Sequence, residues 1–445
     1  MNQGFFAARL ARRLPFFYGW IVLACVCCVA FARTGPAVAT LSLFVGPMTE
    51  EFGWSRAALS GAVSLGGILA AITSPMIGSF LDRQGPRVIL MAAVLTTSAT
   101  ILALSGIHSL LAFYLLFCIA RMNFAGPFDL GTYGAVTNWF VARRPFATSI
   151  ATLAQMVGLT CMPLIGYWAM AHGGWRSGWI AIGLTVLIMG FIPTWALMVR
   201  RPEDLGLRPD GAADPTPPVE STADAAANSA ASPSIPVKPV PEEPEFTRAE
   251  ALATRAFWML SLYTLLIYPV QAGMSLHQAA HIVERGLGGA AAVTSVTSFS
   301  MASALSGLIF GALLRRLGVR MGLAISALLL TAGAHLMQQA STPHAAIFAA
   351  ILFGIGMGGI HIGLPVAWAD YFGRRSFGAI RGVALTIQVS AQASGPLLSG
   401  ALRDISGDYH LSLLCFAALS GAAALAALLV SAPKPIVRVT AGSAG

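Results

Sequence analysis

The sequence predicts an all-α integral membrane protein, with twelve transmembrane helices in two pseudo-symmetric six-helix bundles. Composition, the spacing of apolar segments and an internal repeat carry this prediction. Hydrophobic residues make up 56% and charged residues 10% of the 445 residues, whereas a soluble domain usually carries about 25% charged residues. The mean hydropathy of +0.73 therefore indicates that most of the protein surface faces lipid.

Apolar segments of spanning length follow one another along the chain. A helix needs about 20 mainly apolar residues to cross the hydrocarbon core of a bilayer. Twelve segments meet this requirement, near residues 17–46, 56–80, 87–107, 110–138, 146–171, 176–199, 257–279, 291–314, 320–340, 344–371, 378–402 and 409–431.

A short motif occurs twice and indicates a duplicated bundle. The stretch from Gly78 to Arg87 (GSFLDRQGPR) returns 233 residues later, from Gly311 to Arg320 (GALLRRLGVR). The stretch at 139–146 (WFVARRPF) is echoed at nearly the same offset by residues 371–377 (YFGRRSF). Internal symmetry of this kind is how secondary transporters build a central site.

Lysine and arginine positions predict the orientation. With the N-terminus in the cytoplasm, 21 of these residues lie in cytoplasmic pieces and four in outer pieces, as the positive-inside rule requires. Both termini are then cytoplasmic. The domains expected are an N-terminal bundle (1–199), a flexible cytoplasmic linker (200–256), a C-terminal bundle (257–432) and a cytoplasmic tail (433–445). Ten prolines between Pro202 and Pro244 make the linker unable to bury enough apolar surface to order itself.

Several functional classes are excluded. The arginines behind the net charge of +9 lie between apolar segments and do not cluster on one domain, so we expect no nucleic-acid partner. All six cysteines lie in apolar stretches and are interpreted as packing residues, and we expect no metal site and no cofactor. The chain shows no nucleotide-binding loop and no nucleophile elbow, so we do not expect an enzyme.

The first copy of the repeated motif is a candidate conformational latch. Asp82 can pair with Arg83, with Arg144 or with the positive N-terminal end of a neighbouring helix. Making and breaking such contacts would hold one conformation of the two halves, with Arg87 at the start of the next helix. The alternative is a loop that only sets the membrane topology. The positive-inside rule explains most of the presence of Arg83 and Arg87.

The motif between spans two and three resembles that of major facilitator superfamily transporters. Further stretches narrow the resemblance to the bacterial monocarboxylate-porter and oxalate/formate-antiporter branch: Tyr18-Gly19-Trp20, EFGWSR at 51–56, RPEDLGLRPD at 201–210 and YFGRR at 371–375. The resemblance implies a monomer in the bacterial inner membrane, working by alternating access. Members of that branch typically carry a cation in span eight. Here, span eight has no charge, and span eleven has only Arg381, at its cytoplasmic start.

Ionisable residues inside spans are expensive and are functional candidates. Arg33 in span one precedes Gly35-Pro36, which should break the helix. It is interpreted as an anchor for an anionic substrate or as the partner of an acid on another span. Arg121 in span four resembles the arginine that many proton-coupled members of the superfamily place there. With Asp129 it forms either a static pair or a proton-coupling pair, since a buried carboxylate that meets and leaves an arginine can exchange protons.

Polar residues on spans that the resemblance assigns to the cavity complete the predicted binding site. Tyr268 and Gln271 in span seven, Asn123 in span four and His361 in the glycine-rich span ten are the candidates. His361 can bind substrate or relay a proton, or it can be a packing residue.

Together these residues predict a secondary transporter for a small organic anion, a carboxylate, carried with a proton. Two midmembrane cations set against one midmembrane acid favour this cargo. The alternative is efflux of neutral or hydrophobic compounds, which the 16 methionines and 24 phenylalanines would suit. A membrane sensor would need a folded soluble domain, which the proline-rich linker does not supply.

Overall fold

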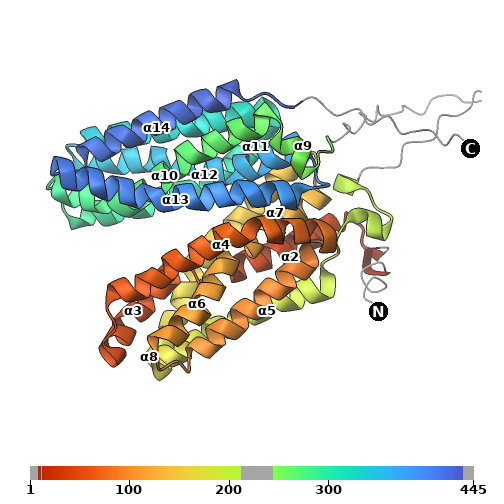
Figure 1. Cartoon of the computed structure of the whole chain (residues 1–445), viewed down its shortest axis with the longest axis horizontal. Coiled ribbons are helices and arrows are strands. Elements are labelled where there is room, and N and C mark those ends of the chain that lie inside the picture. The colour runs from red at the N-terminus through yellow and green to blue at the C-terminus, as the bar shows by residue number, and fades with distance from the viewer. Residues whose placement is uncertain (1–8, 12, 212–243, 434–445) are drawn as a thin grey trace, which may run out of the picture.

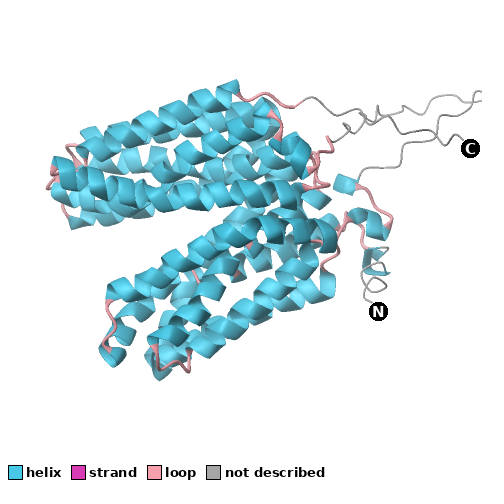
Figure 2. Cartoon of the chain, viewed as in Figure 1, coloured by secondary structure: helices cyan, strands magenta, loops and turns pink. Residues whose placement is uncertain are grey.

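The structure, a computed structural model, describes residues 9–11, 13–211 and 244–433. Within these ranges the chain consists of helices and connecting loops, and no strand occurs (Figure 2). The all-α prediction is confirmed. The N- and C-terminal halves form two separate helical bundles, which lie side by side (Figure 1).

The N-terminal bundle contains the first six predicted spans. Its helices are α2 (Gly19–Ala32), α3 (Val38–Phe52), α4 (Arg56–Gln84), α5 (Pro86–Leu104), α6 (Leu110–Ala125), α7 (Pro127–Trp139) and α8 (Arg144–Leu197). The helix α8 is interrupted at Gly173 and Gly174, whose backbone angles are not helical. It therefore comprises two spans.

The C-terminal bundle contains the other six spans. Its helices are α10 (Arg255–Glu284), α11 (Gly289–Gln339), α12 (Pro343–Phe372), α13 (Phe377–Ser406) and α14 (His410–Leu429). The helix α11 turns at Gly318, which has a φ of +77° and corresponds in the repeat to Gly85, with a φ of +84°. Glycine suits this turn because it has no Cβ to clash in the left-handed region.

Eight helices of the described chain are long and apolar enough to cross a membrane, and two of them, α8 and α11, contain two spans each. The remaining spans are the consecutive helices α2 and α3, which follow one path through the bundle, and the 30-residue α13. The twelve-helix prediction is confirmed.

The ends of the predicted linker are structured, which differs from the expectation of a flexible segment over 200–256. They contain η1 (Pro202–Leu205), η2 (Pro209–Gly211) and α9 (Arg248–Leu252). Phe246 is buried, and its N–H donates to the carbonyl oxygen of Phe372 at 3.3 Å. The middle of the linker, residues 212–243, and the tail from residue 434 lie outside the described residues.

We call the end of the molecule where α4 meets α5 and α12 meets α13 the arginine-rich end, because Arg83, Arg87, Arg144, Arg374 and Arg375 lie there. The opposite end is the arginine-poor end. The two bundles meet at the arginine-rich end and diverge toward the arginine-poor end (Figure 1). Hydrogen bonds between the bundles run from Thr386 and Ala71, near the middle, to Asp82 and Gly378 at the arginine-rich end.

Glycines let the bundles approach closely at two equivalent contacts. Where α4 crosses α13, a Cβ at Gly78 would collide with the carbonyl oxygen of Gly378, and the reverse also holds. Where α11 crosses α8, a Cβ at Gly311 would lie 2.8 Å from Ser149 Oγ and 3.1 Å from the Pro145 carbonyl oxygen. Residues 78 and 311 differ by the repeat offset of 233, and so do residues 145 and 378. We call these two contacts the glycine seams.

Gly78→Ala should destabilise the protein, because the added methyl group meets backbone atoms that cannot move aside. Overpacking of this kind costs about 1–3 kcal/mol. Gly400→Ala in α13 is the matched control, since nothing lies within 4 Å of a Cβ there and alanine is the better helix former. We expect a lower midpoint of thermal unfolding in detergent for Gly78→Ala only. Equal midpoints for the two variants would contradict the close approach.

Candidate functional site

Two broken helices in the N-terminal bundle place the site near the middle of the molecule. The helix α2 ends at Ala32 with Arg33 as its C-cap, and Pro36, which lacks an N–H group, separates it from α3. The helix α6 ends at Ala125 with Gly126 as its C-cap, and Pro127 occupies the first position of α7, where its missing N–H is tolerated. The two breaks bring Arg33 and Asp129, in the first turn of α7, to the same level.

A cavity of about 210 Å³ lies between the two bundles at this level. Both bundles contribute to its wall, and most of the lining side chains carry a polar group. The lining residues are Arg33, Phe124, Asp129, Tyr133, Thr152, Gln155, Met156, Leu159, Tyr268, Gln271, His361, Pro365, Arg381, Gln388 and Gln392.

One carboxylate joins two arginines from opposite bundles at the centre of this cavity. Asp129 Oδ1 lies 3.3 Å from Arg33 Nη2, and Asp129 Oδ2 lies 3.3 Å from Arg381 Nη2. The three residues are 5%, 7% and 1% exposed. Charge-assisted N–H···O bonds are usually 2.7–2.9 Å long, so both contacts are loose. The group carries one more positive than negative charge.

Arg381 is the site residue that the sequence analysis missed. It lies in the second turn of α13, close to the arginine-rich end, but its side chain extends along the helix and donates to Gln388 Oε1 at 2.7 Å. Its position beside charged loop residues suggested only a topological role. The signal that could have found it is the polar face of span eleven, because Arg381, Gln388 and Gln392 are spaced by seven and four residues on one side of a helix.

The cavity arginines have hydrogen-bonding groups to spare. Arg33 Nε, Arg381 Nε and Arg381 Nη1 are buried and have no acceptor in the described structure. Arg33 Nη1 has only a long contact of 3.5 Å to Gln155 Oε1. Buried donors without acceptors are rare in native proteins, and three of those in the described structure belong to these two arginines.

Four of the six residues predicted to bind substrate line this cavity: Arg33, Tyr268, Gln271 and His361. Gln271 Oε1 also accepts a hydrogen bond from Gln392 Nε2 at 3.1 Å. The cavity thus combines two guanidinium groups with neutral donors and acceptors, a combination that can orient a small polar anion.

The geometry corrects the expectations for the other two residues. Asn123 points into its own bundle, where Nδ2 donates to Thr96 Oγ1 at 2.8 Å and Thr97 Oγ1 at 3.0 Å. Arg121 does not line the cavity and does not pair with Asp129. The break at Gly126, with φ −107° and ψ −88°, rotates α7 relative to α6, so the helical spacing between Arg121 and Asp129 does not predict their relative directions.

Phe124 lies between two guanidinium groups. The Cζ atoms of Arg33 and Arg121 lie 4.7 and 4.4 Å from the centre of its ring. The negative faces of an aromatic ring attract cations, so Phe124 lets two like charges share a small volume. Arg121 contributes positive potential to the site through this ring, without direct contact with the cavity.

The predicted latch residues divide into two groups. The Asp82 carboxylate accepts hydrogen bonds from the N–H groups of Gly378 and Ala379, at the start of α13, at 2.7 and 2.8 Å. Arg144 Nη1 lies 2.5 Å from Asp370 Oδ1 on the other bundle. By contrast, Arg83 is exposed, and Arg87 Nη2 donates to the carbonyl oxygen of Trp195 in its own bundle. Asp370 belongs to α12, so the contact with Arg144 crosses from one bundle to the other.

A double-mutant cycle tests whether Asp129 holds Arg381. Asp129→Asn leaves buried cations without their counter-ion, which typically costs about 3–5 kcal/mol. In that background Arg381→Gln should cost less than in the wild type, with a coupling of at least about 1 kcal/mol. Midpoints of thermal unfolding in detergent provide the measurement. Arg121→Gln should show weaker coupling to Asp129→Asn, and stronger coupling to Arg121 than to Arg381 would contradict the observed pairing.

Comparison with solved structures supports the fold over nearly the whole chain. The human organic anion transporter MFSD10 superposes with a TM-score of 0.70 at 13% sequence identity, covering 93% of this chain and 100% of that structure. The proton:xylose symporter XylE gives a TM-score of 0.69 at 12% identity, covering 92% and 94%. Identities this low show a common fold and leave substrates undetermined.

Sequence relatives match a smaller part of the chain. Rattus norvegicus monocarboxylate transporter 4 is 27% identical over 171 residues, or 37% of this chain and 35% of that protein. The oxalate:formate antiporter of Oxalobacter formigenes is 24% identical over 155 residues, or 34% and 37%. The MFS-type transporter YcxA of Bacillus subtilis (strain 168) is 26% identical over 150 residues, or 33% and 36%. The chain therefore matches little more than a third of the length of each of these relatives.

A family model provides the assignment. The model of the Major Facilitator Superfamily matches residues 22–295 and 282–444, which together span both bundles. The two six-helix bundles, the central cavity between them and this match agree. The chain belongs to the major facilitator superfamily, whose members are membrane transporters and not enzymes.

Proposed function

We propose that the protein carries a small organic anion, a carboxylate, across the bilayer together with a proton. The observation that carries the proposal is the pair of guanidinium groups, Arg33 and Arg381, that line one cavity from opposite bundles and share a single carboxylate, Asp129. A substrate carboxylate supplies further acceptors and neutralises the excess positive charge. Planar guanidinium groups suit carboxylates because they can donate two parallel hydrogen bonds.

The size and polarity of the cavity support a small polar cargo. Its volume of about 210 Å³ lies below the range of about 300–1,000 Å³ typical of sites for drug-sized ligands. Gln155, Gln271, Gln388 and Gln392 line it, which would leave amide groups unsatisfied around a hydrophobic compound. This lining disfavours the alternative, efflux of neutral or hydrophobic molecules. Two of the sequence relatives above are named for monocarboxylates or for oxalate and formate, which agrees with the proposal.

Asp129 is the proposed proton carrier. It is the one acidic residue among the described lining residues, and it holds an arginine of each bundle. Protonation removes its charge, releases both guanidinium groups for the substrate and weakens the link between the halves. In this mechanism Arg381 takes the role that the sequence analysis gave to Arg121.

We further propose that the structure is the outward-facing state. If the arginine-rich end is cytoplasmic, as the positive-inside rule predicts, the Asp82 and Arg144 contacts close the inner side and the bundles diverge toward the outside. Asp82 and Arg144 are then the latch, while Arg83 and Arg87 set the topology. We propose a monomer in a bacterial inner membrane, with lipid and a small-molecule cargo as its partners.

Arg33→Gln and Arg381→Gln should each weaken carboxylate binding, because each removes charged donors from the cavity. Hydrogen bonds to charged groups contribute about 1.5–3 kcal/mol, which corresponds to about a 10- to 150-fold rise in the half-saturating concentration. Uptake by proteoliposomes across a panel of radiolabelled carboxylates measures the effect. Arg403→Gln, an exposed arginine paired with Glu284 at the arginine-poor end, is the control. Wild-type uptake by both cavity variants would reject the anchor assignment, and competition by lipophilic compounds alone would favour the alternative.

Asp129→Asn should uncouple transport from protons. The variant cannot exchange a proton, so accumulation against a gradient should stop, while exchange of substrate across the membrane persists. Proteoliposomes with an imposed pH gradient, with and without a protonophore, provide the measurement. Glu51→Gln, on an exposed pair with Arg176 at the arginine-poor end, is the matched control. Uphill accumulation by Asp129→Asn equal to that of the wild type would exclude this residue as the carrier.

A further inference from the structure

We propose that Asp210, in the segment that follows α8, is a positioning residue for the closed arginine-rich end. The second copy of the repeated motif lacks a carboxylate that could cap the start of α8, and Asp210 supplies one. Asp210 acts on the contact between the bundles by positioning Arg144. The inference rests on the proposed alternating access of the two bundles, but it does not depend on the identity of the cargo.

The two glycine seams are equivalent in backbone contact but not in charge. In the first seam, Asp82 caps the start of α13 by accepting from the N–H groups of Gly378 and Ala379. In the second seam, the repeat places Arg315 at the position of Asp82, and that arginine is exposed. The residue that faces Gly311 as Gly378 faces Gly78 is Pro145, which has no N–H group to donate. The second seam therefore cannot use the same cap.

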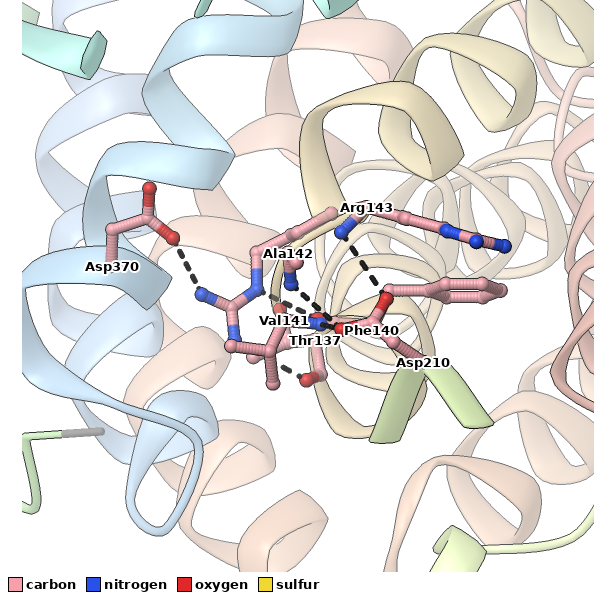
Figure 3. Close-up of polar contacts among 8 residues, drawn as sticks. Thr137, Phe140, Val141, Ala142, Arg143, Asp210 and Asp370 are labelled. Atoms are coloured by element: carbon pink, nitrogen blue, oxygen red, sulfur yellow. Dashed lines mark hydrogen bonds and ion pairs between the residues drawn. The ribbon is translucent and has the colours of Figure 1, made fainter. Parts of the chain in front are cut away.

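Asp210 provides a carboxylate at this second seam from another part of the chain. Its Oδ2 accepts from the N–H groups of Val141 at 2.9 Å and Ala142 at 2.7 Å, and its Oδ1 accepts from that of Arg143 at 3.2 Å (Figure 3). These groups directly precede α8, where a negative charge also interacts favourably with the helix dipole.

The backbone at Asp210 shows that this contact is maintained against strain. Its φ of +58° is the one positive value at a non-glycine residue in the described ranges. Left-handed conformations are uncommon for side-chain-bearing residues, and aspartate and asparagine tolerate them best. Strained conformations persist where the surroundings stabilise them, and three hydrogen bonds to one carboxylate provide that stabilisation.

The consequence of this cap is the position of Arg144. Arg144 directly follows the three capped residues, and its Nη1 reaches Asp370 on the opposite bundle at 2.5 Å. Figure 3 shows Asp210 on one side of this turn and Asp370 on the other. The turn is therefore held by the segment after α8 and by the C-terminal bundle, while the Arg144 guanidinium group also donates to the carbonyl oxygens of Phe140 and Thr137. Releasing Asp210 removes one support from the turn that carries the cross-bundle arginine.

The same segment contacts the other elements of the closed end. Arg200 Nη2 donates to the carbonyl oxygen of Asp82 at 2.8 Å, beside the first seam. Glu203 Oε1 lies 2.6 Å from Arg374 Nη1 on the C-terminal bundle. Residues 200–211 thus connect both seams, and Asp210 anchors the segment at its far end.

A cysteine introduced at Ser149 reports the opening of the second seam. Ser149 is 1% exposed and contacts Gly311, so Ser149→Cys should react with a membrane-impermeant maleimide only when α8 and α11 separate. The full-length chain without its six native cysteines is reconstituted, and reagent is added to either side. Reaction from the side of the arginine-rich end is expected.

Asp210→Gly removes the carboxylate while keeping a residue that favours positive φ, and Asp210→Asn removes only the charge. We expect labelling of the introduced cysteine to accelerate several-fold in Asp210→Gly and less in Asp210→Asn. Asp204→Asn is the matched control, because Asp204 is an exposed acid of the same segment that accepts from the nearby N–H of Arg201 within its own turn. If Asp210→Gly does not yield folded protein, the Asp210→Asn comparison decides.

The route through Arg144 has its own test. In an Arg144→Gln background, which itself accelerates labelling, Asp210→Gly should add little. If the effects of the two substitutions on the labelling rate are additive, Asp210 does not act through Arg144. If Asp210→Gly, Asp204→Asn and the wild type are labelled at equal rates, the proposal is wrong. A failure of carboxylates to change wild-type labelling would speak against the proposed cargo alone, because the Asp210 comparison does not use substrate.

Discussion

The rest of the structure depends on one buried carboxylate that two bundles share. Asp129 belongs to the N-terminal bundle, but it holds Arg33 of its own bundle and Arg381 of the other at equal distances. Neither arginine has a second acidic partner in the described part of the cavity. Removing a counter-ion from buried charges costs about 3–5 kcal/mol of free energy. The negatively charged group between Arg33 and Arg381 therefore decides how closely the two bundles are held together.

The broken helices explain how such a group can be built inside a membrane. A continuous helix satisfies its own backbone, whereas a break exposes polar groups that must be satisfied within the protein. The breaks at Pro36 and Pro127 occur only where the chain lines the polar cavity, and they place Arg33 and Asp129 there. The C-terminal bundle contributes continuous helices, and its long Arg381 side chain covers the distance that a break would otherwise bridge.

The spans and much of the site could be predicted from the sequence because each follows from a local pattern. Apolar length defined the helices, and rare polar residues within them indicated Arg33, Asp129, Tyr268, Gln271 and His361. The errors arose where tertiary geometry decides. The length of its side chain placed Arg381 in the cavity, where it meets the side chain of Gln388, and the rotation at Gly126 separated Arg121 from Asp129. The pairing of Arg144 with Asp370 depends on how the bundles meet, which no single segment encodes.

The glycine seams have a consequence for the speed of the cycle. Most helix contacts interlock side chains, as ridges fit into grooves, and separating them requires many rotamers to move together. At Gly78 and Gly378 the closest facing atoms are backbone carbonyl groups, so fewer side chains have to change rotamer there when the helices part. The activation barrier then depends strongly on the polar contacts between the bundles, which involve Asp82, Arg144 and Asp129. Evolution can retune the turnover rate by editing those polar residues, without repacking the hydrophobic interior.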